Sequence, residues 1–170
     1  MDFVLVKLSK YDIPWFKKTA QEAFQKGFED RFGKTDMIIL PEKDIDEPLE
    51  AKGAAAYKAV ADGEDAGGAI VNIDSESGVN RLDFLFVKRG IQGKGVGQAI
   101  WKEIERLYPE TKVWETCTPY FDRRNIHFYV NVCGFCITEF FCEKHPMPDC
   151  PENFVGDGNE GMFGFRKQMK

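Results

Sequence analysis

The sequence predicts a mixed α/β domain with a central sheet of about seven strands and about four helices. Three observations support this fold class. Strand-like and helix-like periodicities follow one another in the order βααβββαβαββ. A strand that ends at Val87 runs into a glycine-rich loop and then into a helix. At 170 residues the chain is long enough to bury a core of its own, so we expect residues 1–170 to form a single domain.

The net charge and the composition exclude some classes of function. The net charge of −5 argues against binding to nucleic acid or to an anionic membrane surface, and it fits a cationic or amine substrate. No apolar run approaches the roughly 18 residues that a membrane span needs. Asp2 and the alternating pattern after it are unlike a signal peptide. We therefore expect a cytoplasmic protein that binds no membrane.

The first strand and the first helix follow from the spacing of apolar residues. Residues 3–8 are mostly apolar and predict a buried strand. Asp12 is placed to cap a helix that has Pro14 in its first turn, and we expect this helix to end at Gly27. Its buried stripe consists of Ile13, Phe16, Ala20 and Phe24.

Residues 33–49 have an irregular pattern. This segment contains the apolar run 37–40, followed by an acidic run that consists of Glu42, Asp44, Asp46, Glu47 and Glu50. Two interpretations stay open. The acidic run is either a solvated helix face or loop, or a surface that attracts a positively charged substrate.

Three antiparallel strands are expected before the glycine loop. Residues 57–61 and 66–73 have strand patterns, and the Asp-Gly pair between them is a hairpin signal. A second turn at 75–78 leads into the strand that ends at Val87.

Helices and strands alternate in the second half of the chain. Ile100, Ile104 and Leu107 mark the buried face of the helix after the glycine loop, and Pro109 ends that helix. The remaining expected elements are a strand at 112–117, a helix at 122–132 with Ile126, Tyr129 and Val130 on one side, a strand at 135–141, a loop at 145–157 and a final strand at 162–169, antiparallel to the one before it.

The loop after Val87 has the composition of an anion-binding site. Three glycines at alternate positions, Gly93, Gly95 and Gly97, let the main chain approach a phosphate without a Cβ in the way. A strand, a glycine loop and a helix start together turn free N–H groups toward an anion. Lys94 adds a cation. The sequence therefore predicts a ligand that contains phosphate.

Two well-known phosphate motifs do not fit this loop. The dinucleotide motif G-x-G-x-x-G fails because Gln98 takes the third glycine position, counted from Gly93. The nucleoside-triphosphate motif G-x-x-x-x-G-K-[ST] fails because Gly95 follows Lys94.

The loop reads Gln92-Gly-Lys-Gly95-Val-Gly97. It resembles the pyrophosphate loop of the GNAT N-acetyltransferase superfamily, whose signature is Gln/Arg-x-x-Gly-x-Gly/Ala. The order βααβββαβαββ, which spans nearly the whole chain, is also that of the GNAT fold. The resemblance implies acetyl-CoA, or coenzyme A as its product, and no metal.

A second GNAT-like motif lies near the end of the chain. The superfamily often shows Asn-x-x-Ala-x-x-Leu/Phe-Tyr followed by Gly-Phe, and Phe128-Tyr129 and Gly134-Phe135 match these pairs. The interval from Tyr to Gly is one residue longer than in the commonest form. The stretch looks like a bacterial subgroup that reads R-N-x-H-F-Y-x-N-x-C-G-F.

The start of this motif departs from the family pattern. Asp122 takes the usual Asn position, and Asn125 takes the usual Ala position. Either residue could contact the cofactor. We favour Asn125, because an acidic side chain is a poor neighbour for phosphate.

The resemblance implies roles for further residues. Phe86 and Val87 would pair their main chain with the pantetheine arm, and a backbone N–H near Val87 would stabilise the oxyanion. Tyr129 would protonate the departing thiol, since the phenol pKa of about 10 is close to that of a thiol. Asp83 and Glu115 are candidate bases for the attacking amine. The residues expected to contact the cofactor are Phe86, Val87, Gln92, Gly93, Lys94, Gly95, Val96, Gly97, Gln98, Asn125 and Phe128.

These roles have structural alternatives. Tyr129 could be a core aromatic residue, and Asp83 and Glu115 could be structural or solvated. Thr116, Cys117 and Thr118 could hydrogen-bond the cofactor or only pack.

The function that the resemblance implies is an N-acetyltransferase that moves an acetyl group from acetyl-CoA to a primary amine of a small molecule or a protein by direct attack. The alternative is a non-catalytic acyl-CoA-binding module of the same fold, acting as a sensor or partner protein. The resemblance is compatible with a homodimer.

The spacing of the cysteines suggests reduced thiols rather than a zinc site. Cys133-x-x-Cys136 and Cys142-x-x-His145 contain residue types that bind zinc. If 134–142 is one strand, however, Cys136 and Cys142 lie ~20 Å apart at ~3.3 Å per residue, which is too far to share one ion. We therefore expect reduced cysteines that pack as small apolar residues.

Overall fold

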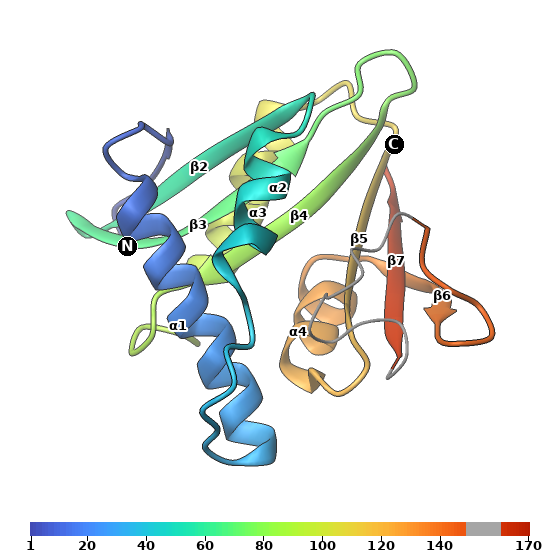
Figure 1. The fold of residues 1–170 in the computed structure, drawn as a ribbon. Helices are drawn as coiled ribbons and strands as arrows, with labels where there is room; N and C mark the ends of the chain where they lie inside the picture. Colours follow the sequence, from blue (N-terminus) through green and yellow to red (C-terminus); the bar gives the residue numbers. More distant parts are fainter. Residues whose placement is uncertain (149–160) are drawn as a thin grey trace.

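The fold is built on one mixed sheet with the strand order β1-β2-β3-β4-β5-β7-β6 (Figure 1). The computed structural model describes residues 1–148 and 161–170. Within them, the elements follow the predicted order βααβββαβαββ. The strands are β1 (Phe3–Lys7), β2 (Ala54–Ala61), β3 (Glu64–Asn72), β4 (Val79–Val87), β5 (Val113–Pro119), β6 (Cys136–Phe141) and β7 (Met162–Gln168). The helices are α1 (Ile13–Phe32), α2 (Glu42–Glu50), α3 (Val96–Leu107) and α4 (Arg123–His127), which continues into the π-helix η1 (Phe128–Val132).

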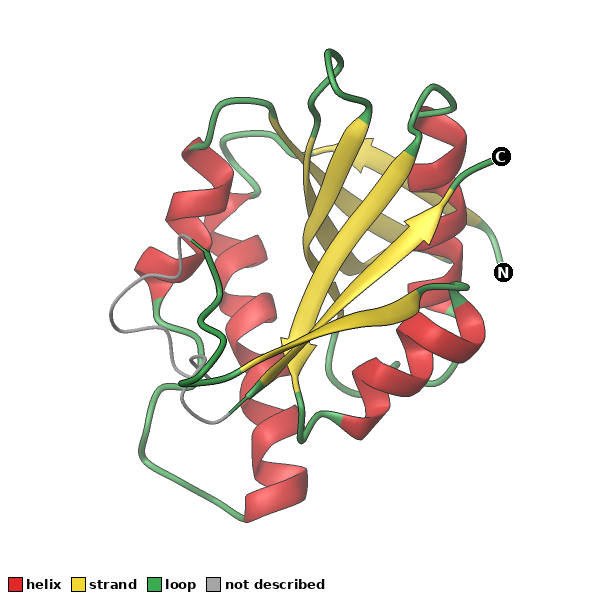
Figure 2. Cartoon of the chain, turned by 90° about the vertical axis from the view of Figure 1, so that its right-hand side faces the viewer, coloured by secondary structure: helices red, strands yellow, loops and turns green. Residues whose placement is uncertain are grey.

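Helices lie on both faces of the sheet (Figure 2). Successive side chains of a strand point to opposite faces, so β3 and β4 contribute to two cores. Around α1 and α2, the buried core includes Phe16, Ile45, Ile70 and Phe86. Around α3 and η1, it includes Val71, Leu85, Ile100, Trp101, Trp114 and Tyr129.

Helix α1 is longer than predicted. Phe16 and Ala20 are buried as expected, but the helix passes Gly27 and ends only at Gly33, whose φ is 88° and whose N–H donates to the Glu29 carbonyl at 2.8 Å. Gly27 does not have a positive φ, so it weakens the helix without ending it. The prediction that α1 ends at Gly27 is therefore wrong.

Residues 42–50 form α2, so the irregular segment is shorter than predicted. Glu42 and Asp44 lie in its first turn, where acidic groups favour a helix start. Ile45 is fully buried and anchors α2 to the sheet. Part of the acidic run is a solvated helix face, on which Glu42 pairs with Lys17 of α1 at 3.2 Å.

The hairpin between β2 and β3 turns where the sequence predicts. Asp62 and Gly63 both have positive φ, of 52° and 81°, which suits a two-residue turn between twisted strands. The turn at 75–78 also forms, and it leads into β4.

The sheet opens between β4 and β5. These parallel strands pair at only three positions, the last of which joins Arg81 to Glu115. Beyond this pair they diverge into the V seen in Figure 1. Residues 82–87 of β4, apart from Asp83, therefore pair with β3 on one edge and with no described strand on the other.

Strand β4 has a bulge at this opening. Ile70 and Val71 of β3 face Phe84 and Leu82, so Asp83 is an extra residue with no partner in the register. Bulges re-aim a side chain and are common next to active sites.

The buried face of α3 differs from the prediction at one end. Ile100 and Ile104 are fully buried, but Leu107 is 37 % exposed. Trp101 and Tyr108 extend the buried stripe at three- and four-residue steps from Ile104, and Leu107 falls outside it.

The helix predicted at 122–132 changes type half-way. The Cys133 N–H donates to the Phe128 carbonyl at 2.9 Å, five residues back, which is the bond of a π-helix. This wide turn accommodates the additional residue between Tyr129 and Gly134.

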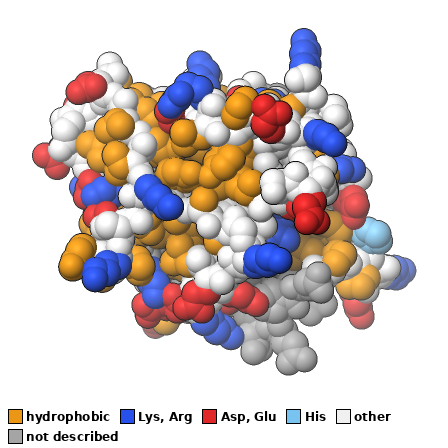
Figure 3. Space-filling view, turned by 90° about the horizontal axis from the view of Figure 1, so that it is seen from above, with side chains coloured by type: hydrophobic (Ala, Val, Ile, Leu, Met, Phe, Trp, Pro, Cys, Tyr) orange, Lys and Arg blue, Asp and Glu red, His pale blue; other side chains and the backbone are white. Residues whose placement is uncertain are grey.

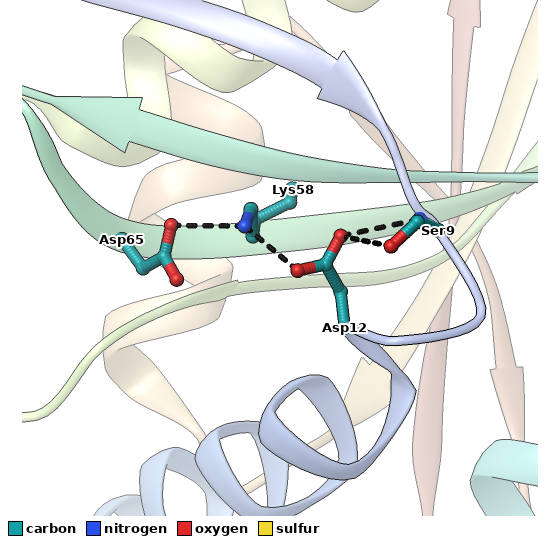
Figure 4. Close-up of polar contacts among 4 residues, drawn as sticks. All are labelled: Ser9, Asp12, Lys58 and Asp65. Atoms are coloured by element: carbon teal, nitrogen blue, oxygen red, sulfur yellow. Dashed lines mark hydrogen bonds and ion pairs between the residues drawn. The ribbon is translucent and has the colours of Figure 1, made fainter.

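Polar contacts tie the turn before α1 to β2 and β3 (Figure 4). The Asp12 carboxylate accepts from the Ser9 hydroxyl at 2.7 Å and from Lys58 Nζ at 2.8 Å, and Lys58 also pairs with Asp65 at 3.1 Å. The hydrogen bonds from Lys58 and Ser9 lower the pKa of Asp12 to about 2. Asp12 lies at the predicted N-cap, but its side chain does not cap the helix.

Seen from above, hydrophobic side chains gather in the middle of one face, with charged side chains around them (Figure 3). Within residues 1–148 and 161–170, no helix has both the length and the apolar character to cross a membrane.

The cysteines that suggested zinc are separated by β6. This strand begins at Cys136, and Cys142 follows its end, while Cys133 is buried next to η1. Across the described part of the chain, no group of three His, Cys, Asp or Glu side chains is arranged to hold a metal ion. The predicted loop at 145–157 lies largely outside the described residues, as does Cys150.

Candidate cofactor and catalytic site

Helix α3 begins without a side-chain cap. Gly95 precedes it with a φ of 85°, and the first bond of the helix runs from the Ala99 N–H to the Gly95 carbonyl at 3.0 Å. The N–H groups of Val96, Gly97 and Gln98 therefore have no carbonyl to donate to within the helix. With the helix dipole behind them, these groups suit an anion.

A cavity of about 550 Å³ opens in front of this N-terminus. Its walls come from α1, the end of β4, the glycine loop and the region of α4 and η1. Most residues predicted to bind the cofactor line it, namely Phe86, Val87, Gln92, Gly93, Gly95, Gly97, Gln98, Asn125 and Phe128. Lys94 is exposed and Val96 is buried, and neither side chain lines the cavity.

Three arginines, Arg31, Arg123 and Arg124, also line the cavity. Arg124 Nη1 donates to Gln92 Oε1 at 3.0 Å, and Gln92 Nε2 donates to the Val87 carbonyl at 3.2 Å. These two bonds tie the loop to the end of β4 and hold the Arg124 guanidinium beside it. A planar guanidinium is well suited to phosphate oxygens. The sequence prediction did not include these arginines, although the Arg-Arg pair directly before Asn125 was a signal for them.

The backbone of Val87 lies on the open edge of β4. The Lys88 N–H donates to the Ala66 carbonyl of β3 at 2.8 Å. Because main-chain groups alternate along a strand, those of Phe86 also face β3, whereas those of Val87 face the diverging β5. The Phe86 ring packs in the core, with its centroid 4.8 Å from that of Phe16. Of the two residues, Val87 thus has the main-chain groups on the open edge, where its carbonyl accepts from Gln92 Nε2 and its N–H faces the gap between the strands.

Gly97 has a packing role as well. A Cβ at this position would lie 3.3 Å from the Phe128 ring and 3.5 Å from the Val87 side chain. The absence of a side chain therefore lets Phe128 lie close to the start of α3.

Tyr129 and Thr116 meet where β4 and β5 separate. Thr116 Oγ1 donates to the Leu82 carbonyl at 2.8 Å, and the same side chain acts to lower the pKa of Tyr129. Tyr129 is 5 % exposed and packs against Phe135 and Phe165. Burial raises the pKa of its phenol well above the ordinary value.

Asp83 is a half-buried carboxylate at the bulge of β4. Its side chain is 16 % exposed, and Oδ1 lies 3.3 Å from Arg81 Nε. Oδ2 is buried without a hydrogen-bond partner among the described residues. Desolvation raises the pKa of Asp83, and the nearby Arg81 lowers it by less. A carboxylate with a raised pKa is the stronger base.

Glu115 lies in the next strand but has a partner. Its Oε1 is 3.2 Å from Arg166 Nε of β7, and the side chain is 39 % exposed. Tyr129, Asp83 and Glu115 surround the point where the strands part, but none of them lines the cavity.

Asp122 and Asn125 have different partners at the start of α4. The Asp122 carboxylate accepts the Asn125 N–H at 3.0 Å and so caps the helix. Burial raises the pKa of Asp122. Asn125 Nδ2 donates to Thr118 Oγ1 at 3.4 Å. Both residues line the cavity, and Asn125 has the neutral side chain.

Comparison with known proteins agrees with this fold. A model of the acetyltransferase (GNAT) family matches residues 16–135. The chain belongs to this family. The YrkN protein of Bacillus subtilis (strain 168) is 41 % identical to this GNAT chain over 174 residues, which cover 98 % of this chain and 94 % of YrkN.

Solved GNAT structures share the fold at low sequence identity. The ribosomal-protein-S18-alanine N-acetyltransferase of Escherichia coli matches with a TM-score of 0.67 and 15 % identity, covering 98 % of this chain and 94 % of that one. A GNAT family acetyltransferase of Elizabethkingia anophelis, solved with acetyl-CoA bound, matches with a TM-score of 0.68 and 16 % identity, covering 98 % of both chains. The predicted GNAT fold is confirmed.

Proposed function

We propose that this GNAT chain is an N-acetyltransferase that moves an acetyl group from acetyl-CoA to a primary amine of a small molecule or a protein by direct attack. The observation that supports it most is the uncapped start of α3, which faces a cavity lined by glycines and arginines. Such donors suit the phosphates of coenzyme A. We further propose that residues 1–170 act as one domain, because strands from both ends of the chain belong to one sheet.

The cofactor would be held by three groups of donors. The N–H groups of residues 96–98 and the Arg124 guanidinium would bind its phosphates, and the Val87 backbone would pair with the pantetheine arm. Asn125 would donate its side-chain amide from α4. When bound, acetyl-CoA supplies a thioester whose carbonyl carbon an amine can attack.

Asp83 would accept the proton of the attacking amine, directly or through water. Its raised pKa makes it a stronger base than an ordinary aspartate, and its Oδ2 has no partner among the described residues. Glu115 is the second candidate, but its Oε1 is already paired with Arg166 Nε of β7. The rate should therefore fall as the pH drops through the raised pKa of Asp83.

Tyr129 would protonate the departing thiolate. Its raised pKa keeps the phenol protonated at neutral pH, so it holds a proton to donate.

A non-catalytic acyl-CoA-binding module is the second candidate function. The observation that favours it is the position of Tyr129, Asp83 and Glu115, which do not line the cavity next to the glycine loop. In this case the same cavity would bind the ligand without turnover.

Release of free thiol from acetyl-CoA over a panel of amines tests both candidates. The panel contains small amines, lysine peptides and peptides with free N-termini. We expect turnover with at least one amine, and a decrease in kcat of about 100-fold for Tyr129→Phe. Tyr11→Phe is the matched control, because Tyr11 is 83 % exposed and does not line the cavity. Tight CoA binding with no turnover on any amine, and no effect of Tyr129→Phe on it, would favour the binding module.

The remaining proposals concern the acceptor, the cellular location, the subgroup and the oligomeric state of the enzyme. The net charge of −5 supports an acceptor that is cationic, and it argues against nucleic acid and anionic membranes as partners. We also propose a cytoplasmic location, membership of the subgroup with the R-N-x-H-F-Y-x-N-x-C-G-F motif, and a homodimer. Light scattering of the purified protein tests the last of these.

A further inference from the structure

The cavity in front of α3 is lined from both faces of the sheet. Helix α1 packs on one face, in the core that includes Phe16 and Phe86, whereas α3 and η1 pack on the other. Residues of α1 line the cavity together with the start of α3 and the region of α4. The cavity also borders the end of β4, where this strand has lost its pairing with β5. A ligand in the opening between the strands can therefore meet side chains from both helical layers.

Arg31 lies at the end of the α1 wall of this cavity. It is in the last turn of α1, in the part of the helix that continues past Gly27. Its guanidinium carbon is 5.6 Å from the centroid of the Phe32 ring, a cation–π distance, and that ring packs against Phe121 with 5.0 Å between centroids. Phe28 contacts both rings, at 4.8 and 6.0 Å. This aromatic cluster joins the end of α1 to the turn before α4, and it supports Arg31 at the cavity.

The charged groups that line the cavity differ in whether they have partners. Both carboxylates are engaged, Asp30 with Lys26 of the same helix and Asp122 with a backbone N–H of α4. The three arginines have no carboxylate within ion-pair distance among the residues that the structure describes. The cavity is therefore positive, although the net charge of the chain is −5.

The cofactor does not require all three arginines. Under the proposed function, its phosphates meet the N–H groups of residues 96–98 and the Arg124 guanidinium, with Arg123 directly before it on α4. These donors belong to α3 and α4, while Arg31 belongs to α1 on the other face of the sheet. With the pantetheine arm along Val87 in the opening, the α1 side is where a second molecule would approach the thioester. Arg31 is therefore available to the acceptor.

We propose that Arg31 binds a carboxylate or phosphate group of the acceptor, so that the acceptor is an amine that also carries a negative group. The inference rests on the proposed function and names the chemical class of its acceptor. A guanidinium can donate two parallel hydrogen bonds to either anion, which fixes the orientation of the bound molecule as well as its position. The amine remains the cationic part of the acceptor, in keeping with the net charge of the chain. Acidic amino acids, and peptides with an acidic residue beside the reacting amine, belong to this class.

Kinetics with paired acceptors test this class. Each pair differs in one charge: glutamate and glutamine, and peptides in which a free N-terminus or a lysine is followed by Glu or by Gln. The wild type should prefer the charged member by about tenfold in kcat/KM, and R31Q should remove the preference by slowing the charged member alone. R31K keeps the charge without the planar fork and should retain part of the preference. The matched control is R106Q, because Arg106 is the basic residue in the last turn of α3 and does not line the cavity.

A binding measurement without turnover separates this inference from the proposed function. The same pairs are titrated into the complex with CoA by isothermal titration calorimetry. We expect the charged member to bind about tenfold more tightly to the wild type and to R106Q, and no more tightly than the neutral member to R31Q. CoA and dephospho-CoA, which lacks the 3′-phosphate, are titrated into the free proteins. The ratio of these two affinities should be the same in R31Q and the wild type, because the cofactor phosphates meet α3 and α4.

Each result has one meaning. If the wild type turns over no amine but R31Q loses the preference for the charged member in binding, the proposed function fails and the anion site at Arg31 holds. If the wild type has no such preference, or if R31Q keeps it, the inference is overturned. A loss in R31Q that is larger for CoA than for dephospho-CoA would assign Arg31 to the 3′-phosphate of the cofactor, and would also overturn it. An equal loss for both members of every pair would do the same, because Arg31 would then support α1 and not the ligand.

Discussion

The N-termini of α3 and α4 face the same cavity and are built in opposite ways. At α3, Gly95 takes the cap position with a φ of 85° and offers no side chain to the first N–H groups. At α4, the Asp122 carboxylate occupies that place and accepts the Asn125 N–H at 3.0 Å. One helix start is left for an external anion, and the other is satisfied from within the chain.

The difference shows how one chain separates binding from stability. A capping side chain stabilises a helix by about 1 kcal/mol, so an uncapped helix start costs the free protein stability. It also keeps donors available for a ligand with negative charge. The presence or absence of a side-chain acceptor, rather than the helix itself, therefore distinguishes the two ends.

The largest effect is expected when the open end is blocked. Gly95→Val places a branched side chain at the loop where phosphate is expected, and should weaken CoA binding by at least about 100-fold, or about 2.7 kcal/mol, by isothermal titration calorimetry. Gly90→Val is the matched control, because Gly90 also has a positive φ, of 93°, and open space around it, but does not line the cavity. Both variants share the backbone strain, so only the first should lose the ligand. Equal losses in the two would mean that the loop is sensitive to strain and is not a phosphate site.

An intermediate effect is expected when a negative charge is added to the open end. Gln98 is exposed in the first turn of α3 and lines the cavity. Gln98→Glu should stabilise the free protein by about 0.5 kcal/mol through the helix dipole, and weaken CoA binding about tenfold through repulsion of phosphate. The two quantities move in opposite directions, and Gln98→Ala should change neither by much. Tighter CoA binding by Gln98→Glu would contradict an anion site.

The smallest effect is expected at the capped end. Asp122→Ala should lower the free energy of unfolding by about 1 kcal/mol in chemical denaturation, and Asp122→Asn should retain most of it, because Asn also caps. Burial raises the pKa of Asp122 above 3.8, so its ionisation disfavours the folded state. Relative to Asp122→Asn, the wild type should lose stability as the pH rises from about 3.8 toward the raised pKa. If Asn is as destabilising as Ala, the carboxylate acts through its charge and not as a cap.

Much of the fold could be predicted because its signals are local. Apolar runs predicted the strands, Asp62 and Gly63 predicted the hairpin, and the glycine loop predicted the start of α3. The errors occurred where tertiary packing overrides local preference. Gly27 lies inside α1 because its backbone is helical, and α2 forms because Ile45 is buried against the sheet.

The site was only partly predictable for a similar reason. The glycine loop is a contiguous motif, so its residues were found together. The arginines at 123 and 124 approach it from another helix, outside that contiguous motif. The divergence of β4 and β5 depends on the pairing of whole strands, and no single residue in either strand indicates it in the sequence.

The π-helix also affects how this chain is compared with others. One residue added to an α-helix turns everything beyond it by about 100°, which would take the following Gly134-Phe135 pair away from the core. Here the added residue is contained within a single wide turn, and Tyr129 still packs against Phe135 and Phe165. The number of residues between this tyrosine and Gly134 is therefore not a reliable criterion for aligning GNAT sequences. A search motif that fixed that interval would reject a chain in which the aromatic packing is intact.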